Sequence, residues 1–226
     1  MFERFRQRSY ELERLDTGDY TPEEYARWER EMPWIHGVWG EKRAIENSLV
    51  RDIRQCGLTR ASILDVGAGS GGLLNMIGEM LDGVDLFLAG GELNDTALAS
   101  MSESGVASLK ADALRLPFED DVFDYVICSL LLHHLSDDDA ARLVTEMDRV
   151  ARINFYIVDL NRHPVGYYGY RLLSPLFFQK FTQEDGALSI LRSFTPDEML
   201  DLARGVGITS PKVEHSRANR LVLSRG

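Results

Sequence analysis

A short glycine-rich turn is the part of this sequence with the clearest chemical meaning. The apolar run Ile63-Leu64-Asp65-Val66 leads into Gly67-Ala68-Gly69-Ser70-Gly71-Gly72, and a second apolar segment follows. This order predicts a strand, a tight turn and a helix. Such a turn directs backbone N–H groups and a helix N-terminus at a ligand beyond the carboxyl end of the strand. The turn therefore predicts a nucleotide-binding site.

Two classes of nucleotide cofactor compete for this turn. Glycines at 67, 69 and 72 match the dinucleotide spacing, whereas those at 67, 69 and 71 match the spacing of S-adenosylmethionine sites. Asp65 distinguishes the two classes, because a carboxylate two positions before the first glycine repels a pyrophosphate and attracts a positively charged ligand. S-adenosyl-L-methionine has no phosphate and carries a cationic ammonium and sulfonium, so Asp65 favours it over a nicotinamide dinucleotide. A glycine turn without any ligand stays as the structural alternative.

Two further acids follow the next two predicted strands. Glu92 lies in Gly90-Gly91-Glu92-Leu93-Asn94, where an acid at the tip of the second strand can accept hydrogen bonds from ribose hydroxyls. Asp112 lies just past the third strand, where it can accept from an adenine amino group while Ala113 packs on the ring. The alternatives are a solvated loop acid for Glu92 and a turn cap for Asp112. Three acids at three successive strand ends favour the binding role.

The elements that must position these residues alternate from Ala61 onward. Short apolar runs and amphipathic segments follow one another, which is typical of βα units around a parallel sheet. Strands are predicted at Ser62–Val66, Val84–Ala89, Val106–Lys110, Phe123–Ser129 and Ile153–Val158. Helices are predicted between them at Gly72–Leu81, Asp95–Met101 and Asp137–Ala151.

Both ends of the chain extend this pattern. Residues 1–58 are predicted to be helical throughout, with a capping box at Thr21 and Glu24 and a helix end at Pro33; a second helix is expected over residues 40–56. A late helix is predicted to start at Thr195-Pro196, and the runs at 212–215 and 220–224 predict a closing hairpin.

The expected fold class is α/β: a Rossmann-like, doubly wound, mostly parallel seven-stranded sheet with a closing antiparallel strand and an N-terminal helical cap. Residues 1–58 form the cap, and residues 59–226 form the core with a lid-like insertion at 162–192.

A resemblance to a known family is carried by ILDVGAGSGGLL, GGELN, ADALRLPF and FDYVICSLLLHHL, in this order. Over roughly residues 61–160 the chain resembles the class I S-adenosylmethionine-dependent methyltransferases. The resemblance implies a cofactor site lined by Asp65, Gly67, Ala68, Gly69, Gly71, Glu92, Leu93, Asp112 and Ala113, with Ser129 beside the methionyl group. The chain departs from the family at residues 149–153, where a Pro-Gly-Gly turn is usual.

A second resemblance covers the two ends of this region. The segments HHLSDDDAARLVTEMDRVAR, VDLNRHPVGYYGYRLLSP and LSILRSFTPDEM are similar to small bacterial methyltransferases found beside type III polyketide synthases, and to quinone-biosynthesis methyltransferases. This resemblance implies a small aromatic acceptor of phenolic, polyketide or quinone type.

Three residues are candidates for the chemistry of methyl transfer. A phenol has a pKa near 10, so attack at neutral pH benefits from a base, and histidine suits that task. His133 and His134 follow the fourth strand, and Asp159 follows the fifth. Neighbouring residues of an extended chain point to opposite sides, which favours only one histidine, His133, facing the pocket. The alternative is that both histidines hold the loop by hydrogen bonds.

Other polar and aromatic residues flank these candidates. Asp159 or His163 can orient a substrate hydroxyl, whereas Arg162 is better explained by pairing with a neighbouring acid. Aromatic residues from both flanking segments can build an apolar lid or ordinary core: Tyr167, Tyr168, Tyr170, Phe177, Phe178, Phe181, Trp34 and Trp39, together with Ile35.

Composition excludes several classes of protein. A formal net charge of -11 repels a phosphate backbone, which argues against nucleic acid as a partner. The longest apolar runs fall well short of the roughly 20 residues that cross a bilayer, so no membrane insertion is expected. No signal peptide is apparent, and a cytoplasmic location is the default expectation. Cys56 and Cys128 have no His or Cys at ligand spacing, so they are expected to be reduced core residues and no metal site is predicted.

Overall fold

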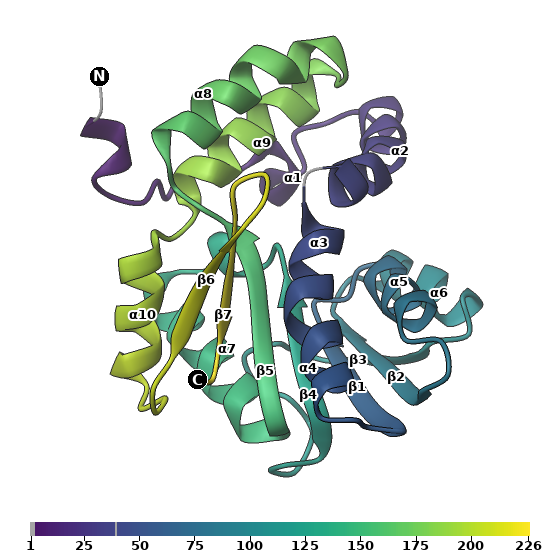
Figure 1. The fold of residues 1–226 in the computed structure, drawn as a ribbon. Coiled ribbons are helices and arrows are strands. Elements are labelled where there is room, and N and C mark those ends of the chain that lie inside the picture. Colours follow the sequence, from purple (N-terminus) through teal and green to yellow (C-terminus); the bar gives the residue numbers. More distant parts are fainter. Residues whose placement is uncertain (1–2, 39) are drawn as a thin grey trace.

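The computed structural model describes residues 3–38 and 40–226 (Figure 1). Its described residues form a seven-stranded sheet in the order β3-β2-β1-β4-β5-β7-β6. The strands are β1 (Arg60–Val66), β2 (Asp85–Glu92), β3 (Ala107–Lys110), β4 (Phe123–Ser129), β5 (Ala151–Leu160), β6 (Lys212–Ser216) and β7 (Arg220–Ser224). The first five are parallel, while β7 runs antiparallel to both β5 and β6. The predicted fold class is confirmed.

Helices cover both faces of the sheet (Figure 1). One face packs against α3 (Glu41–Ile45), the single π-helical turn η2 (Glu46–Val50), α4 (Arg51–Gln55), α5 (Gly72–Met80) and α6 (Asp95–Glu103). The other face packs against α7 (Asp137–Val150) and α10 (Pro196–Gly205). Each face buries its own apolar cluster, because strands enclosed on both sides carry apolar residues in continuous runs.

The predicted strands and helices of the core agree with the structure within a few residues. β4 and β7 have the predicted bounds, and Thr195 caps α10 through a capping box with Glu198. At the departure from the usual Pro-Gly-Gly turn, α7 ends at Val150 and β5 begins at Ala151 without a loop.

The N-terminal region differs from the sequence prediction in several places, among them Cys56, which was expected in the core and is exposed. Residues 6–13 are not helical, although η1 (Glu3–Phe5) and α1 (Arg14–Thr17) flank them. The expected helix end at Pro33 is also wrong, because α2 (Pro22–Val38) continues through this residue. A proline in a helix interior costs about 3 kcal/mol. Directly after it, the Trp34 ring packs 5.0 Å from that of Phe177, and this contact favours continuing the helix.

A helical layer lies over the carboxyl end of the parallel strands (Figure 1). It contains α1, α2, α8 (Pro164–Leu173), η4 (Ser174–Leu176) and α9 (Lys180–Arg192). α9 contacts η3 (Leu132–His134), the turn that follows β4, so the layer meets the strand ends directly. Within the described residues, no helix is both long and apolar enough to cross a membrane.

Candidate functional site

The glycine turn adopts the conformation of one of its two possible spacings. Gly67, Gly69 and Gly71 all have positive φ, whereas Gly72 begins α5. A Cβ on Gly71 would lie 2.9 Å from Cγ of Met101, but one on Gly72 would meet nothing within 4 Å. In a dinucleotide site the third glycine is needed for close helix–strand packing. Gly72 has no such packing requirement, so the geometry supports the 67, 69, 71 spacing.

Asp65 is buried at the end of β1 without a full set of partners. Its side chain is 1% exposed, and no described residue hydrogen-bonds to its Oδ1. Burial, together with the nearby negative charges of Glu41 and Glu92, raises the pKa of Asp65 to about 8. An unpartnered buried carboxyl is costly to a protein unless a ligand completes it. Its position and charge fit a cofactor that brings a cationic group.

Glu92 joins β2 to the glycine turn. Its Oε2 accepts a hydrogen bond from the Gly69 N–H at 2.9 Å, and its Oε1 accepts from the N–H groups of Leu93 and Asn94. The backbone reinforces this link, since the N–H groups of Gly67 and Ala68 both donate to the Gly91 carbonyl. Glu92 therefore fixes the shape of the turn from the adjacent strand, while the Leu93 side chain is exposed.

Asp112 follows β3 and is exposed. Its Oδ1 accepts from the Leu114 N–H at 2.9 Å, so it caps the local turn. Ala113 is half-buried and packs against the core. The turn-capping alternative is thus present, and the capping bond leaves Asp112 beside the end of β3.

Ser129 ends β4 and leads to two buried charges that the sequence prediction missed. Its Oγ donates to Oε1 of Glu41, the first residue of α3. Glu41 and Arg220 are each 2% exposed, and Nε of Arg220 has no hydrogen-bond partner among the described residues. Burial lowers the pKa of Arg220, whereas Glu41 and Asp159 act to raise it. Nothing in the local sequence marks either residue, because an acid at a helix start and an arginine at a strand start are ordinary.

His133 and Asp159 form a buried pair at the ends of β4 and β5. Nδ1 of His133 lies 2.6 Å from Oδ1 of Asp159, and the His133 backbone N–H donates to Oδ2. Burial acts to raise the pKa of Asp159, but the charge and hydrogen bond of His133 outweigh it, so the pKa lies below its usual value. Because the carboxylate accepts from Nδ1–H, the acceptor lone pair of the imidazole lies on Nε2.

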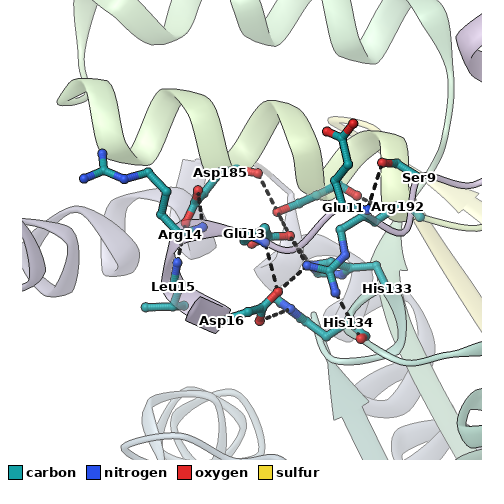
Figure 2. A network of polar contacts seen from close by, with 12 residues as sticks. Ser9, Glu11, Glu13, Arg14, Leu15, Asp16, His133, His134, Asp185 and Arg192 are labelled. Atoms are coloured by element: carbon teal, nitrogen blue, oxygen red, sulfur yellow. Dashed lines mark hydrogen bonds and ion pairs between the residues drawn. The ribbon is translucent and has the colours of Figure 1, made fainter. Parts of the chain in front are cut away.

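The expectation that the two histidines point apart is wrong. Residues 132–134 form a 3₁₀ turn, not an extended chain, and the two rings lie with centroids 4.2 Å apart. His134 Nδ1 is 3.1 Å from Asp16 Oδ1, and Nε2 of His133 is 4.0 Å from Glu13 Oε1. Figure 2 shows both rings turned toward the N-terminal segment that carries these acids.

The remaining candidates have structural contacts. Arg162 pairs with Glu198, as the sequence favoured, and also donates to the Phe5 and Ser193 carbonyls. His163 caps α8 through its side chain.

The aromatic residues form mainly core. The helical layer has its own apolar cluster of Phe5, Tyr167, Tyr170, Phe178 and Ile190. Trp34, Tyr168 and Phe177 keep exposed surface, and Trp39 lies outside the described residues.

Comparison with known families identifies the central part of the chain. The family described as "Methyltransferase domain" matches residues 63–154. The match runs from within β1 to within β5, so it contains the glycine turn and the ends of β1, β2, β3 and β4. It contains neither the end of β5 nor Arg220 at the start of β7. No curated protein sequence matches the chain.

Solved structures share the fold of this methyltransferase. A possible histamine N-methyltransferase from Thermotoga maritima is 17% identical with a TM-score of 0.61, over 88% of this chain and 94% of that one. An S-adenosylmethionine-dependent methyltransferase from Aquifex aeolicus is 16% identical with a TM-score of 0.57, over 78% and 88%. A plantazolicin methyltransferase in complex with a substrate analogue and SAH is 18% identical, TM-score 0.57, over 73% and 74%. The domain match and the shared fold support S-adenosylmethionine as cofactor, and the predicted enzyme class is confirmed.

Proposed function

We propose that this methyltransferase transfers a methyl group from S-adenosylmethionine to a small aromatic acceptor of phenolic, polyketide or quinone type. The observation that carries the proposal is the buried Asp65 carboxyl, which lacks a partner on Oδ1 directly before a turn with the 67, 69, 71 glycine geometry. When bound, the cofactor supplies a methyl group on a cationic sulfur.

The chain's own residues divide the binding work. Asp65 neutralises positive charge, and Glu92 and Asp112 hold the ribose and adenine side with the backbone of Gly67 to Gly71. Leu93, Ala113 and Ser129 complete the cofactor surface. Burial of Asp65 strengthens its interaction with a positive charge, because the local dielectric is lower than that of water.

The acceptor side of the proposal involves three residues. His133 offers its Nε2 lone pair to an acceptor hydroxyl, Asp159 fixes the His133 tautomer through the 2.6 Å contact, and His134 positions the loop through Asp16. The helical layer of α1, α2, α8, η4 and α9 covers this edge and excludes water, which favours cancellation of charge during methyl transfer.

Two measurements test this function. Calorimetry on the full chain is expected to detect S-adenosylmethionine and no NAD(P). A panel of phenols, quinones and amines, assayed for S-adenosylhomocysteine release, is expected to give turnover with phenols or quinones. Binding of NAD(P) in place of S-adenosylmethionine would refute the cofactor assignment, and cofactor binding without turnover on any aromatic acceptor would refute the acceptor class.

A further inference from the structure

A cluster of potential metal ligands joins the N-terminal segment to the end of β4. Glu13, His133 and His134 each offer one ligand atom, and these three atoms lie within 4.8 Å of one another. Glu13 and His133 are buried, and His134 is half-buried. Figure 2 shows these side chains converging from the segment before α1 and from η3.

The hydrogen bonds of His133 prepare it to act as a ligand. Its Nδ1 is held by Asp159, whereas Nε2 makes no hydrogen bond to any residue in the described ranges 3–38 and 40–226. Metal-bound histidines usually place their second nitrogen against a carboxylate in this way, which fixes the ring and increases the basicity of the ligating nitrogen. The Nε2 atom faces Glu13 Oε1 across 4.0 Å.

The spacing is close to that of a bound cation. Two tetrahedral ligands about 2.0–2.1 Å from a zinc ion lie roughly 3.3 Å apart. The separations of 4.0 Å and of no more than 4.8 Å exceed this spacing by about 0.7 to 1.5 Å, so metal binding requires side-chain movements of that size.

The charges around the cluster leave room for a divalent cation. Glu13, Asp16 and Asp159 carry three negative charges when ionised, and Arg192 supplies one positive charge through contacts with Glu13 and Asp16. Asp137, Asp185 and Arg8 also lie nearby, and together they do not cancel this excess of negative charge.

Each of these three residues already has a partner of its own. Arg8 is engaged by Asp137, and Asp185 accepts from the backbone N–H groups of Arg14 and Leu15.

We propose that Glu13, His133 and His134 bind one zinc-class divalent cation, while Asp159 holds the imidazole of His133 through Nδ1. Two imidazole nitrogens and one carboxylate oxygen suit zinc, and three protein ligands leave one coordination position open. A cation bound here crosslinks the N-terminal segment to the sheet edge. A cation on Nε2 of His133 would occupy the lone pair that the proposed function offers to the acceptor hydroxyl, so the two roles exclude each other at that atom. Metal binding is therefore measured by itself, without methyl transfer.

Metal binding to the full chain tests this site directly. After treatment with a chelator, the protein is titrated with Co²⁺ and then with Zn²⁺. The expected result is a tetrahedral Co²⁺ visible spectrum at one equivalent per chain, which Zn²⁺ abolishes. Zinc is also expected to raise the melting temperature, because it binds the folded chain.

Three variants identify the ligands. E13Q and H134Q are expected to weaken zinc binding by at least roughly tenfold to a hundredfold, because each removes one proposed ligand of the cation. H215Q alters an exposed histidine of β6 and is expected to leave it unchanged. Circular dichroism verifies that each variant is folded. If one of the two ligand variants fails to fold, the other alone tests the proposal. The proposal is overturned if wild-type protein gives no one-equivalent Co²⁺ spectrum, or if folded E13Q or H134Q binds zinc as tightly as H215Q.

Discussion

The buried carboxyl of Asp65 should give the free protein a stability that depends on pH. Burial raises its pKa from 3.8 to about 8. Between these values the folded state binds more protons than the unfolded state, so the free energy of unfolding decreases as pH rises from about 4 to 8. At 1.36 kcal/mol per pKa unit, the penalty reaches about 4 kcal/mol at pH 7. This value is an upper bound for the linkage of one group.

Asp65→Asn removes this titration. A buried amide without a partner on one side costs about 1–3 kcal/mol, so the variant is expected to gain a net 1–3 kcal/mol at pH 7. At pH 4.5 the gain is expected to vanish or reverse, because the carboxyl of the wild type is then protonated. Urea unfolding at several pH values measures the difference. Asp85→Asn, an exposed aspartate at the start of β2, is the matched control and should show no such trend.

The same variant should bind S-adenosylmethionine more weakly. Loss of a charged interaction worth about 1.5–3 kcal/mol reduces affinity roughly tenfold to a hundredfold. A cationic ligand also lowers the pKa of Asp65, so the wild type should release a proton on binding at pH 7. Calorimetry in buffers of different ionisation enthalpy detects that proton. A stability difference that does not change with pH, together with unchanged affinity, would refute the reasoning.

Four further substitutions test the glycine turn and the cap of α10. Gly71→Ala should destabilise the fold by about 1–3 kcal/mol in urea unfolding, because φ is +82° and the added Cβ lies 2.9 Å from Met101 Cγ. Gly72→Ala should be neutral or stabilising. Equal effects of the two substitutions would contradict the assigned glycine spacing. Glu92→Gln should lower the free energy of unfolding by about 1–2 kcal/mol, since an amide NH₂ then faces backbone N–H donors. It should also weaken cofactor binding about tenfold by calorimetry, and unchanged binding would show that Glu92 is not part of the cofactor site. Thr195→Ala should lower the free energy of unfolding by about 1 kcal/mol and the melting temperature by about 2–4 °C. An unchanged melting curve would show that the cap of α10 contributes nothing to stability.

Local patterns predicted most of the fold. The strands β1 to β5 and the helices between them follow from alternation of apolar runs and amphipathic segments, because each element satisfies its own hydrogen bonds and buries one face. The prediction was wrong at Pro33, where the local rule for proline was overcome by tertiary packing of Trp34 on Phe177. It was also wrong for residues 6–13, whose polar side chains bond to distant segments.

The candidate site was predictable only where its residues follow a strand. Asp65 and Glu92 could be placed because each ends a parallel strand of the predicted sheet. Glu13, Glu41 and Arg220 could not, since they reach the same edge from the two ends of the chain. The 3₁₀ turn at 132–134 was also hidden, because a three-residue turn has no periodicity to read.

The position of β7 affects the order in which the protein can be completed during synthesis. This strand lies between β5 and β6, although both precede it in the chain. Until residues 220–224 have left the ribosome, β5 keeps an open edge of unpaired N–H and carbonyl groups beside a large apolar surface. Nascent chains that stall before this point would expose an unpaired edge strand, which can pair with other chains or bind chaperones.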